Sequence, residues 1–408
     1  MRPLLGLLLT TCLALTACGS SGSSSPKATN TPVPKATHTP DPNASPAATS
    51  THKATRTPTM TGGPTRTPTI TGGPTYTPRP TKTPGPPVTL YVRQSGSDDN
   101  AGTAPDQALR TLGAAIKKLS PGSTLHVGRG VYQERLTVSN IAGTAALPVQ
   151  ILADSKGAQT GDPAGDVIID GGGDLVAAIV TSSPYLTIDG FILRGVVPTD
   201  TVSAVGLRVR GGSDHDTIRN CVIANAQPAD GIRVDSSSDV LLFNNLVFSA
   251  DRGIIVTGAA NRVQLVNDTV ALSQRAALSL RASGGSTPSG VAVTNCIMQE
   301  NGTGAAIDAS GAIGGYSGDY NLVFQPGVGD QHTAYNPTTL RGDHDKNVDA
   351  LFVNLNVGDV HLEANSPAID AGTGRIDDAL KAALEERTTT ADGGKDRSPL
   401  DLGYHYPR

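Results

Sequence analysis

One short phrase returns along the middle of the chain, and it limits the possible folds more than any other feature. Each copy is a short run of alternating apolar residues that ends in Gly or Asn, and the copies lie 23 to 30 residues apart. The copies end at Gly190, Asn220, Asn244, Asn267, Asn295 and, in a weaker form, Asn321. A second apolar phrase falls between successive copies, as at residues 206–209 and 231–234. Because no helical pattern separates the two phrases, each repeat predicts at least two short strands.

Strands that return once per repeat predict parallel coils stacked along one axis. A β-sandwich would also contain short strands, but it gives no reason for asparagine to return at the same phase. Stacked coils would align these amides in a hydrogen-bonded ladder inside a turn. Cys221 and Cys296 each follow the asparagine of their coil, so the stack places them in one column three rungs apart, about 14 Å at ~4.8 Å per rung. That separation excludes a disulfide and predicts two small packing residues.

The coils and two flanking segments resemble the right-handed parallel β-helix proteins of the pectate-lyase-like group, over about residues 88–370. The flanking matches are Tyr91–Thr103 and Pro121–Tyr132 before the coils, and Gly358–Leu362, Asn365–Gly372 and Asp401–Gly403 after them. Between the first two, residues 106–119 place apolar side chains on one helical face suited to capping the stack. A helical insert at 377–387 interrupts the closing pattern. The resemblance predicts an all-β, right-handed parallel β-helix solenoid with a short N-terminal capping helix and an irregular C-terminal cap.

The first eighteen residues are typical of an export signal. Arg2 precedes an apolar run, Leu4–Leu15, that is too short to remain as a membrane span. Leu15-Thr16-Ala17-Cys18 follows this run and resembles the lipobox of bacterial lipoproteins. That resemblance implies lipidation of Cys18. We therefore expect an exported protein that is held on the extracellular face of the cell envelope and touches the membrane through its lipid anchor only.

The rest of the chain divides into a stalk and a folded domain. Residues 19–87 hold 15 of the 29 prolines, together with many Thr, Ser and Gly, and have too few apolar residues to bury a core. They predict a disordered stalk. Residues 88–408 form the predicted β-helix domain, with an N-terminal cap at 88–135, coils at 136–353 and a C-terminal cap at 354–408.

Charge and aromatic content narrow the choice of partner. Residues 88–408 hold 24 Lys and Arg against 35 Asp and Glu, which argues against a nucleic-acid partner. The chain has 9 Tyr, 5 Phe and no Trp, which argues against a module that stacks neutral sugars on aromatic rings. We expect a monomer that binds an acidic polysaccharide or another envelope glycan, the substrate class that the family resemblance implies.

Charged residues of the second phrase should face outward from the coils. Arg208 and Arg233 should lie on adjacent rungs, and Arg210 should lie next to Asp235 as a structural ion pair. Two guanidinium groups about 5 Å apart repel each other unless an anion or a carboxylate lies between them. Their planar donor sets suit a sugar carboxylate or sulfate, so an anion site and a solvated surface are the two alternatives here.

Catalysis is the second possibility, because the family includes polysaccharide lyases and hydrolases. A lyase needs a base and a cation, in this family usually Ca²⁺ bound by aspartates, but no lysine lies between Lys156 and Lys346 to act as that base. An arginine base would be Arg233. The catalytic candidates are Arg233, Asp235, Arg208, Asp230 and Asp251. The three aspartates could bind calcium, two of them could form the acid and base of a hydrolase, or all could be turn carboxylates.

A run of alternating oxygen ligands forms a separate candidate metal site. Its members are Asp343, Asp345, Asn347 and Asp349, spaced like the start of a calcium loop. Val348 stands where such loops have Gly, and Asn354 stands where they have Glu. Calcium binding and a polar turn both stay open.

Two functions from different classes follow. The first is a non-catalytic adhesin or scaffold that binds acidic polysaccharide. The second is a polysaccharide lyase, acting by calcium-assisted β-elimination with an arginine base, or a glycoside hydrolase of the same fold. The missing lysine, and the missing paired-Asp signatures of the polygalacturonase branch, favour the first.

Overall fold

A computed structural model of the protein describes residues 85–175, 177–199, 203–224, 228–302, 304–310, 313–326 and 334–408. These residues belong to one compact unit. The predicted signal segment at 1–18, with Cys18, and nearly all of the predicted stalk at 19–87 lie outside the described residues.

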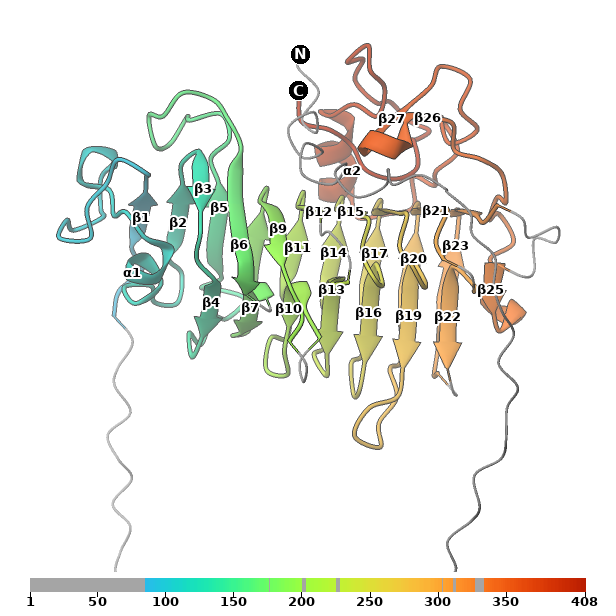
Figure 1. Ribbon diagram of the computed structural model, residues 1–408, viewed down its shortest axis with the longest axis horizontal. Coiled ribbons are helices and arrows are strands. Elements are labelled where there is room, and N and C mark those ends of the chain that lie inside the picture. Colours follow the sequence, from blue (N-terminus) through green and yellow to red (C-terminus); the bar gives the residue numbers. More distant parts are fainter. Residues whose placement is uncertain are drawn as a thin grey trace, which may run out of the picture. The chain divides into compact units, whose positions relative to one another are not determined.

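Three parallel sheets run along the stack of coils (Figure 1). Sheet A contains β1 (Thr89–Val92), β2 (Thr124–Val127), β5 (Val149–Ala153), β8 (Leu186–Asp189), β11 (Thr217–Arg219), β14 (Leu241–Phe243), β17 (Gln264–Val266), β20 (Ala292–Thr294) and β23 (Ser317–Asp319). Sheet B contains β3 (Gly130–Tyr132), β6 (Val167–Leu175), β9 (Ile192–Val196), β12 (Val222–Ala224), β15 (Leu246–Phe248), β18 (Thr269–Ala271), β21 (Ile297–Gln299) and β24 (Leu322–Phe324). Sheet C contains β4 (Leu136–Ser139), β7 (Ala177–Ser182), β10 (Val205–Val209), β13 (Asp230–Asp235), β16 (Ile254–Thr257), β19 (Leu278–Arg281), β22 (Ile307–Ser310) and β25 (Tyr335–Asn336).

Each regular coil contributes one strand to each sheet, and the alternation of the sequence explains the core. In sheet A, Ile218, Leu242, Leu265 and Val293 are register partners on successive rungs, and all four are fully buried. Their neighbours along each strand face outward, as period-two alternation requires. The fold is the predicted right-handed parallel β-helix, with its apolar core inside the coils.

The predicted asparagine column is present at the turn between sheets A and B, and amides bond at two of its three steps. Asn220, Asn244, Asn267 and Asn295 all have left-handed backbone conformations, with φ between 53° and 56°. Asn244 Nδ2 donates to Asn220 Oδ1 at 2.9 Å, and Asn295 Nδ2 donates to Asn267 Oδ1 at 3.3 Å. Asparagine suits this position because it tolerates positive φ and its amide can bond the next rung.

The sixth copy of the phrase differs from the prediction. Tyr320, with φ 58°, has the left-handed position, and Asn321 lies one residue further on. Asn321 Oδ1 accepts from Cys296 N at 2.9 Å, so this residue belongs to a second, inner column of polar side chains. The turn falls one residue earlier in this coil than the phrase suggested.

That inner column follows the ladder by one residue on each rung. It contains Cys221, Asn245, Asp268, Cys296 and Asn321. Both cysteines are free and buried, in agreement with the prediction of packing residues. Asn245 and Asn321 each donate Nδ2–H to a carbonyl of the preceding coil, those of Ile218 and Val293. Asp268 is fully buried among these amides, and its Oδ2 has no hydrogen-bond partner among the described residues.

The N-terminal cap contains a shorter helix than predicted. The helix α1 covers Leu112–Ile116, with Thr111 Oγ1 accepting from Ala114 N at its start, and a 3-10 turn covers Pro105–Gln107. Leu109 is extended between them because it forms a bridge to Val92. The Glu134 carboxylate caps α1 by accepting from Leu112 N and Gly113 N.

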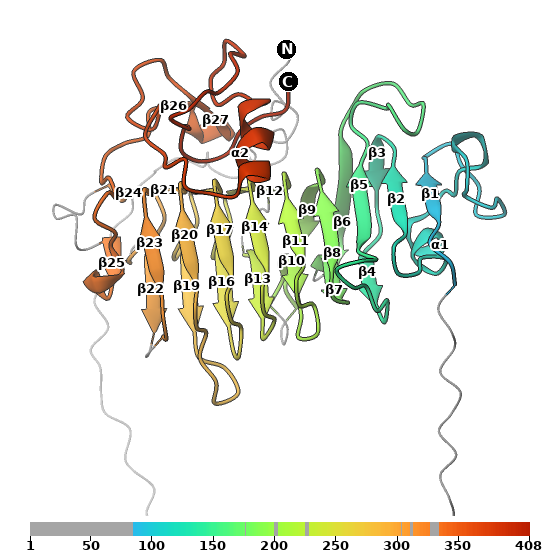
Figure 2. The same ribbon diagram turned by 180° about the vertical axis from the view of Figure 1, so that it is seen from behind.

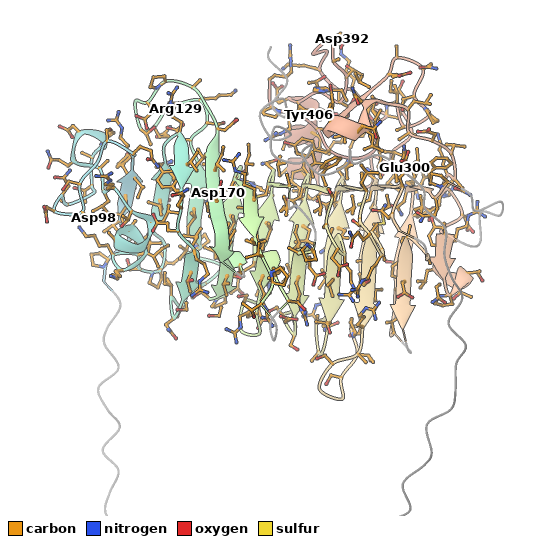
Figure 3. The ribbon with its side chains drawn as sticks, viewed as in Figure 1. Asp98, Arg129, Asp170, Glu300, Asp392 and Tyr406 are labelled. Atoms are coloured by element: carbon orange, nitrogen blue, oxygen red, sulfur yellow. The ribbon has the colours of Figure 1, made fainter. Side chains whose placement is uncertain are left out.

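The C-terminal segment lies along the side of the coils, which differs from the expected cap over the far end. It contains β26 (Phe352–Asn354), β27 (Asp359–Leu362) and α2 (Asp378–Glu385). Figures 1 and 2 both show it beside the strands from β12 to β21, and Figure 3 labels Tyr406 within it. Its apolar residues cover the outward side chains of sheet B, among them Val222, Leu246 and Ile297. Leu384 of α2 packs against Phe243 of sheet A.

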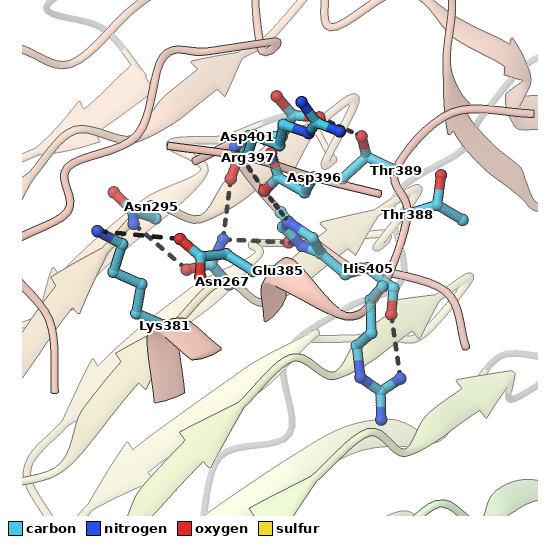
Figure 4. A network of polar contacts seen from close by, with 12 residues as sticks. Asn267, Asn295, Lys381, Glu385, Thr388, Thr389, Asp396, Arg397, Asp401 and His405 are labelled. Atoms are coloured by element: carbon cyan, nitrogen blue, oxygen red, sulfur yellow. Dashed lines mark hydrogen bonds and ion pairs between the residues drawn. The ribbon is translucent and has the colours of Figure 1, made fainter. Parts of the chain in front are cut away.

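The asparagine ladder also holds this segment in place (Figure 4). Asn244 Oδ1 accepts from His405 N at 2.6 Å, and Asn244 Nδ2 donates to His405 O at 3.0 Å. Asn295 forms the same pair of bonds with Thr373, at 2.8 and 3.0 Å, and Asn267 Nδ2 donates to Asp401 O at 3.0 Å. One row of turns therefore joins the coils to one another and to the end of the chain.

Asn244→Ala is expected to lower the free energy of unfolding of the full chain by about 2–4 kcal/mol. Alanine is strained at positive φ, and the change also leaves buried backbone groups of His405 without partners. Urea denaturation followed by circular dichroism measures the loss. Asn140→Ala is the matched control, because Asn140 has the same left-handed conformation (φ 59°) at an exposed turn. Equal losses in the two variants would show that the ladder amide contributes nothing beyond the backbone.

Asp268 predicts a dependence of stability on pH. Its burial raises its pKa to about 7, against 3.8 for the ordinary side chain. Between about pH 4 and pH 7 the folded protein therefore holds a proton that the unfolded chain has lost, so the free energy of unfolding falls as pH rises through this window. The shift corresponds to roughly 4 kcal/mol at most.

Asp268→Asn removes this titration and is expected to raise the stability of the protein at pH 8 and to flatten the slope between pH 4 and pH 7. By analogy with Asn245 and Asn321, the new amide would donate to the carbonyl of Leu242. Urea denaturation at several pH values measures both effects. A variant less stable than the natural protein at pH 8 would contradict the prediction.

Candidate functional site

The predicted arginine cluster lies on the outward face of sheet C. Thr137, Val180, Arg208 and Arg233 are register partners on β4, β7, β10 and β13, so they form one outward column. The predicted adjacency of Arg208 and Arg233 is therefore present. Both guanidinium groups stay partly exposed, with side-chain exposures of 36% and 30%.

A carboxylate lies between these two arginines. Arg208 Nε donates to Asp235 Oδ2 at 2.6 Å, and Arg233 Nε donates to Asp235 Oδ1 at 2.7 Å. Asp235 thus relieves the repulsion of the two cations. The expected pair between Arg210 and Asp235 is absent from the contacts of the described residues, since both oxygens of Asp235 already serve the other two arginines.

A small hollow of about 190 Å³ lies beside the cluster on the same face. Its charged lining is formed by Arg135, Arg208 and Arg210, and its apolar members are Ala177, Val180 and Val205. Arg135 and Arg210 are exposed. Arg135 Nε donates to Thr137 Oγ1 at 3.1 Å, while no carboxylate partner of Arg210 is present in the described part of the chain. The hollow therefore presents guanidinium donors that the carboxylates of the described residues leave largely available.

Sequence reasoning missed Arg135 as a site residue. It precedes β4, in a coil that lacks the asparagine phrase, so its phase relative to Arg208 could not be assigned. The register of β4, β7 and β10 brings the two together. The usable signal in the sequence was the alternation of Leu136, Thr137 and Val138, which places this run on a strand.

The other acidic candidates form a second group of ion pairs on the next rungs. Arg252 Nη1 lies 3.5 Å from Asp230 Oδ1 and 3.8 Å from Asp251 Oδ2, and Arg275 Nε lies 3.0 Å from Asp251 Oδ1. Burial raises the pKa of Asp230, an effect that Arg252 opposes and the charge of Asp251 reinforces. The structure brings Asp230 and Asp251 together around a cation, while Asp235 belongs to the Arg208–Arg233 cluster.

The members of the proposed calcium loop have several protein partners. Asp345 Oδ1 accepts from Asn321 N at 2.7 Å, and its Oδ2 accepts from the Tyr335 hydroxyl at 2.8 Å. Asp349 Oδ1 accepts from Gln299 Nε2 at 2.8 Å, whereas Asp343 is exposed and Asn347 half-buried. Within the described ranges, no three His, Cys, Asp or Glu side chains gather where they could hold a metal ion. Calcium binding by this loop stays a prediction.

Asp235→Asn tests the role of the bridging carboxylate. The change leaves two neighbouring guanidinium groups without a shared anion, so we expect the free energy of unfolding to fall by about 1 kcal/mol or less in dilute chloride. Sulfate at matched ionic strength should reduce the deficit relative to the natural protein, because a divalent anion can take the place of the carboxylate. Urea denaturation in the two salts measures this.

Asp170→Asn serves as the control, since Asp170 forms an ion pair with one arginine, Arg194, at 2.7 Å (Asp170 is labelled in Figure 3). Its deficit should be the same in sulfate and in chloride. A deficit of Asp235→Asn that sulfate leaves unchanged would argue against an anion site at the cluster.

Comparison with known proteins supports the fold and, in part, the family. Residues 178–314 match the family described as "Periplasmic copper-binding protein (NosD)". A stretch of 140 residues is 29% identical to "Uncharacterized protein YwoF" of Bacillus subtilis (strain 168), covering 32% of this chain and 27% of that protein. The chain therefore matches only about a quarter of the length of this curated relative.

Solved structures similar to this chain include a pectate lyase and a rhamnogalacturonan lyase. The pectate lyase Pel9A superposes with a TM-score of 0.51 at 14% identity, over 72% of this chain and 94% of that chain. A rhamnogalacturonan lyase superposes with a TM-score of 0.40 at 15% identity, over 58% of this chain and 68% of that chain. No helix among the described residues is long and apolar enough to cross a membrane. The protein is a right-handed parallel β-helix of pectate-lyase-like fold, with a segment similar to NosD at residues 178–314.

Proposed function

We propose that this protein binds an acidic polysaccharide, extracellular or of the cell envelope, on the outward face of sheet C as a non-catalytic adhesin or scaffold. The observation that carries the proposal is the hollow lined by Arg135, Arg208 and Arg210. Guanidinium groups bind carboxylates and sulfates through pairs of parallel hydrogen bonds. A face with several arginines along a parallel stack offers such groups at the regular spacing of the rungs, which suits a repeating anionic chain.

The geometry of Arg233 favours binding over elimination. A base must offer a nitrogen that can accept the proton at C5 of the uronate. Arg233 Nε donates its hydrogen to Asp235, so the guanidinium is held in an ion pair through this nitrogen. The same contact suits a residue that supplies positive charge to a bound anion.

One observation keeps the enzymatic alternative open. Asp230 is 2% exposed and its pKa is raised by burial, which is the condition of a carboxylic acid that donates a proton in a glycoside hydrolase. Asp251 would be its partner, and in a lyase calcium would assist as a Lewis acid. The fold shared with the pectate lyase Pel9A does not by itself decide the reaction.

A glycan partner fits the described residues better than the copper named in the NosD description. Copper prefers His, Cys and Met ligands. Cys221 and Cys296 are both buried, and burial raises the pKa of the Cys221 thiol to about 12, so it stays protonated. The described residues also lack a metal-binding cluster, as noted above.

We further propose that the protein is exported and lipid-anchored through Cys18. The lipobox-like segment before Cys18 and the periplasmic description of the NosD family support this placement. The Thr- and Pro-rich residues 19–87 would then hold the β-helix away from the membrane. Such a tether suits a scaffold that meets polysaccharide outside the cell.

Arg208→Ala combined with Arg210→Ala is expected to weaken binding to polygalacturonate at least tenfold, because two guanidinium contacts are lost. Affinity electrophoresis and calorimetric titration of the full chain measure the loss. Arg375→Ala is the control, since Arg375 is exposed and lies outside the hollow. Binding that is equally strong in both variants would refute the proposed face.

The same preparations decide between binder and lyase. Incubation with polygalacturonate, with and without Ca²⁺, is followed by the absorbance of the unsaturated product. We expect no absorbance growth. Growth that disappears in Arg233→Ala would establish the lyase and overturn the non-catalytic proposal.

A further inference from the structure

A larger cavity, of about 730 Å³, lies away from sheet C, at the ridge between sheets A and B. One wall is the loop that joins β5 to β6, and the other is formed by the end of α2 and the last residues of the chain. The turns at Gly190 and Asn220 lie between these walls. The volume is in the range of pockets that enclose a small ligand.

The floor of this cavity is apolar and partly aromatic. It contains Ile192 and Val222 from sheet B, Phe243 from sheet A, and Tyr404 from the C-terminal segment. The exposure of each is only 2% to 6%, because the same side chains pack against their neighbours below. Apolar and aromatic side chains pack against the CH faces of sugar rings, and here each of them offers a small part of its surface to the cavity.

Two arginines, Arg219 and Arg387, also line the cavity. Arg219 lines the cavity and its Nε donates to Asp189 Oδ2 at 2.8 Å, while no hydrogen-bond partner of its Nη nitrogens is present among the described residues. Arg387 is half-buried. Among the described residues its guanidinium donates one long hydrogen bond, from Nη1 to His405 O at 3.4 Å. Burial lowers the pKa of Arg387, an effect that Tyr404 and the Asp189 carboxylate oppose and that the positive charge of Arg219 reinforces. An anion between the two guanidinium groups would add to the opposing charge of Asp189.

The loop wall is preformed and supplies an acceptor. The Asp154 carboxylate accepts from the backbone N–H groups of Ala158, Gln159 and Thr160 at 2.7–3.0 Å, which fixes the loop. Asp166 lines the cavity beyond it, and burial raises the pKa of this carboxylate. Such a group can accept a hydrogen bond from a sugar hydroxyl.

A peptide ligand fits this cavity less well than a sugar. Along the same ridge, Asn244 and Asn295 bind the backbone of the C-terminal segment through their carboxamides. At the cavity the carboxamide of Asn220 is already used on both sides, by Asp189 Oδ1 at 2.7 Å and by Asn244 Nδ2 at 2.9 Å. Gly190 has no side chain to offer. Charged side chains of both signs, rather than backbone-binding amides, therefore define the cavity: they are Lys156, Arg219, Arg387, Arg408, Asp154, Asp166, Asp189 and Glu386.

We propose that this cavity binds an anionic sugar unit, with Arg219 and Arg387 holding its carboxylate or sulfate, the floor packing against its ring and Asp166 accepting from a hydroxyl. The site uses none of the residues of the sheet C face, so it does not depend on the function proposed there. With both sites occupied, one molecule would hold two polysaccharide chains, and the effective concentration at the second site would raise the overall avidity.

The test exploits the absence of tryptophan from the chain. Ala383 is exposed on α2 and lines the cavity, so Ala383→Trp introduces a single indole at its edge. Addition of trigalacturonate to this full-length variant should change the indole emission in a saturable way. Arg387→Gln in the same background should weaken the response at least tenfold, about 1.4 kcal/mol, whereas the exposed control Arg375→Gln should leave it unchanged. Maltotriose, which has no charge, should give no response.

Calorimetric titration of the natural chain with trigalacturonate gives an independent measure, with two sites expected. Arg387→Gln should remove one of them, and Arg208→Ala with Arg210→Ala the other. Two outcomes would overturn the cavity proposal. The first is no emission change, together with a single calorimetric site whose affinity is unchanged by Arg387→Gln. The second is an emission change that is unaffected by Arg387→Gln. If the indole emission responds as expected but Arg208→Ala with Arg210→Ala binds trigalacturonate like the natural chain, the sheet C site is refuted and the cavity site is retained.

Discussion

The row of left-handed turns between sheets A and B is the constraint on which the rest of this structure depends. A coil can stack on the next only if its chain bends at the same place on every rung, and Asn220, Asn244, Asn267 and Asn295 supply that turn. The amide of Asn244 bonds that of Asn220, and the amide of Asn295 bonds that of Asn267, so these turns also fix the register within each pair. In a solenoid, where each coil contacts only the adjacent coils, such a column transmits alignment along the stack.

The same row determines how the chain ends. Three of the four asparagines bond the backbone of residues 373–405, so the C-terminal segment lies along the side of the coils and covers the apolar outward face of sheet B. The segment stops covering the ridge near Asn220, and a cavity begins there. The larger candidate site therefore results from the packing of the C-terminal segment. One of its arginines, Arg219, comes from a coil, and the other, Arg387, comes from the segment.

Charge on the outward face of sheet C follows a different rule. The alternation of β10 and β13 predicts correctly that Arg208 and Arg233 are neighbours. It does not predict which carboxylate each arginine selects, because a long side chain reaches a diagonal neighbour as easily as the residue directly opposite. Asp235 was expected to pair with Arg210 and instead bridges Arg208 and Arg233, which leaves Arg210 exposed beside the hollow. The choice of ion-pair partners on sheet C thus leaves Arg210 available, and this makes the charged face a candidate anion site.

The sequence by itself determined the coils, the parallel stack, the asparagine ladder and the neighbours within sheet C, because these depend on a period of two within strands and a repeat of about two dozen residues. Tertiary structure alone decided the position of the C-terminal segment, the short length of α1 and the placement of Arg219 and Arg387 in the lining of one cavity. The physical reason is separation along the chain. Asn267 and Asp401 meet across 134 residues through a single hydrogen bond that no local pattern encodes.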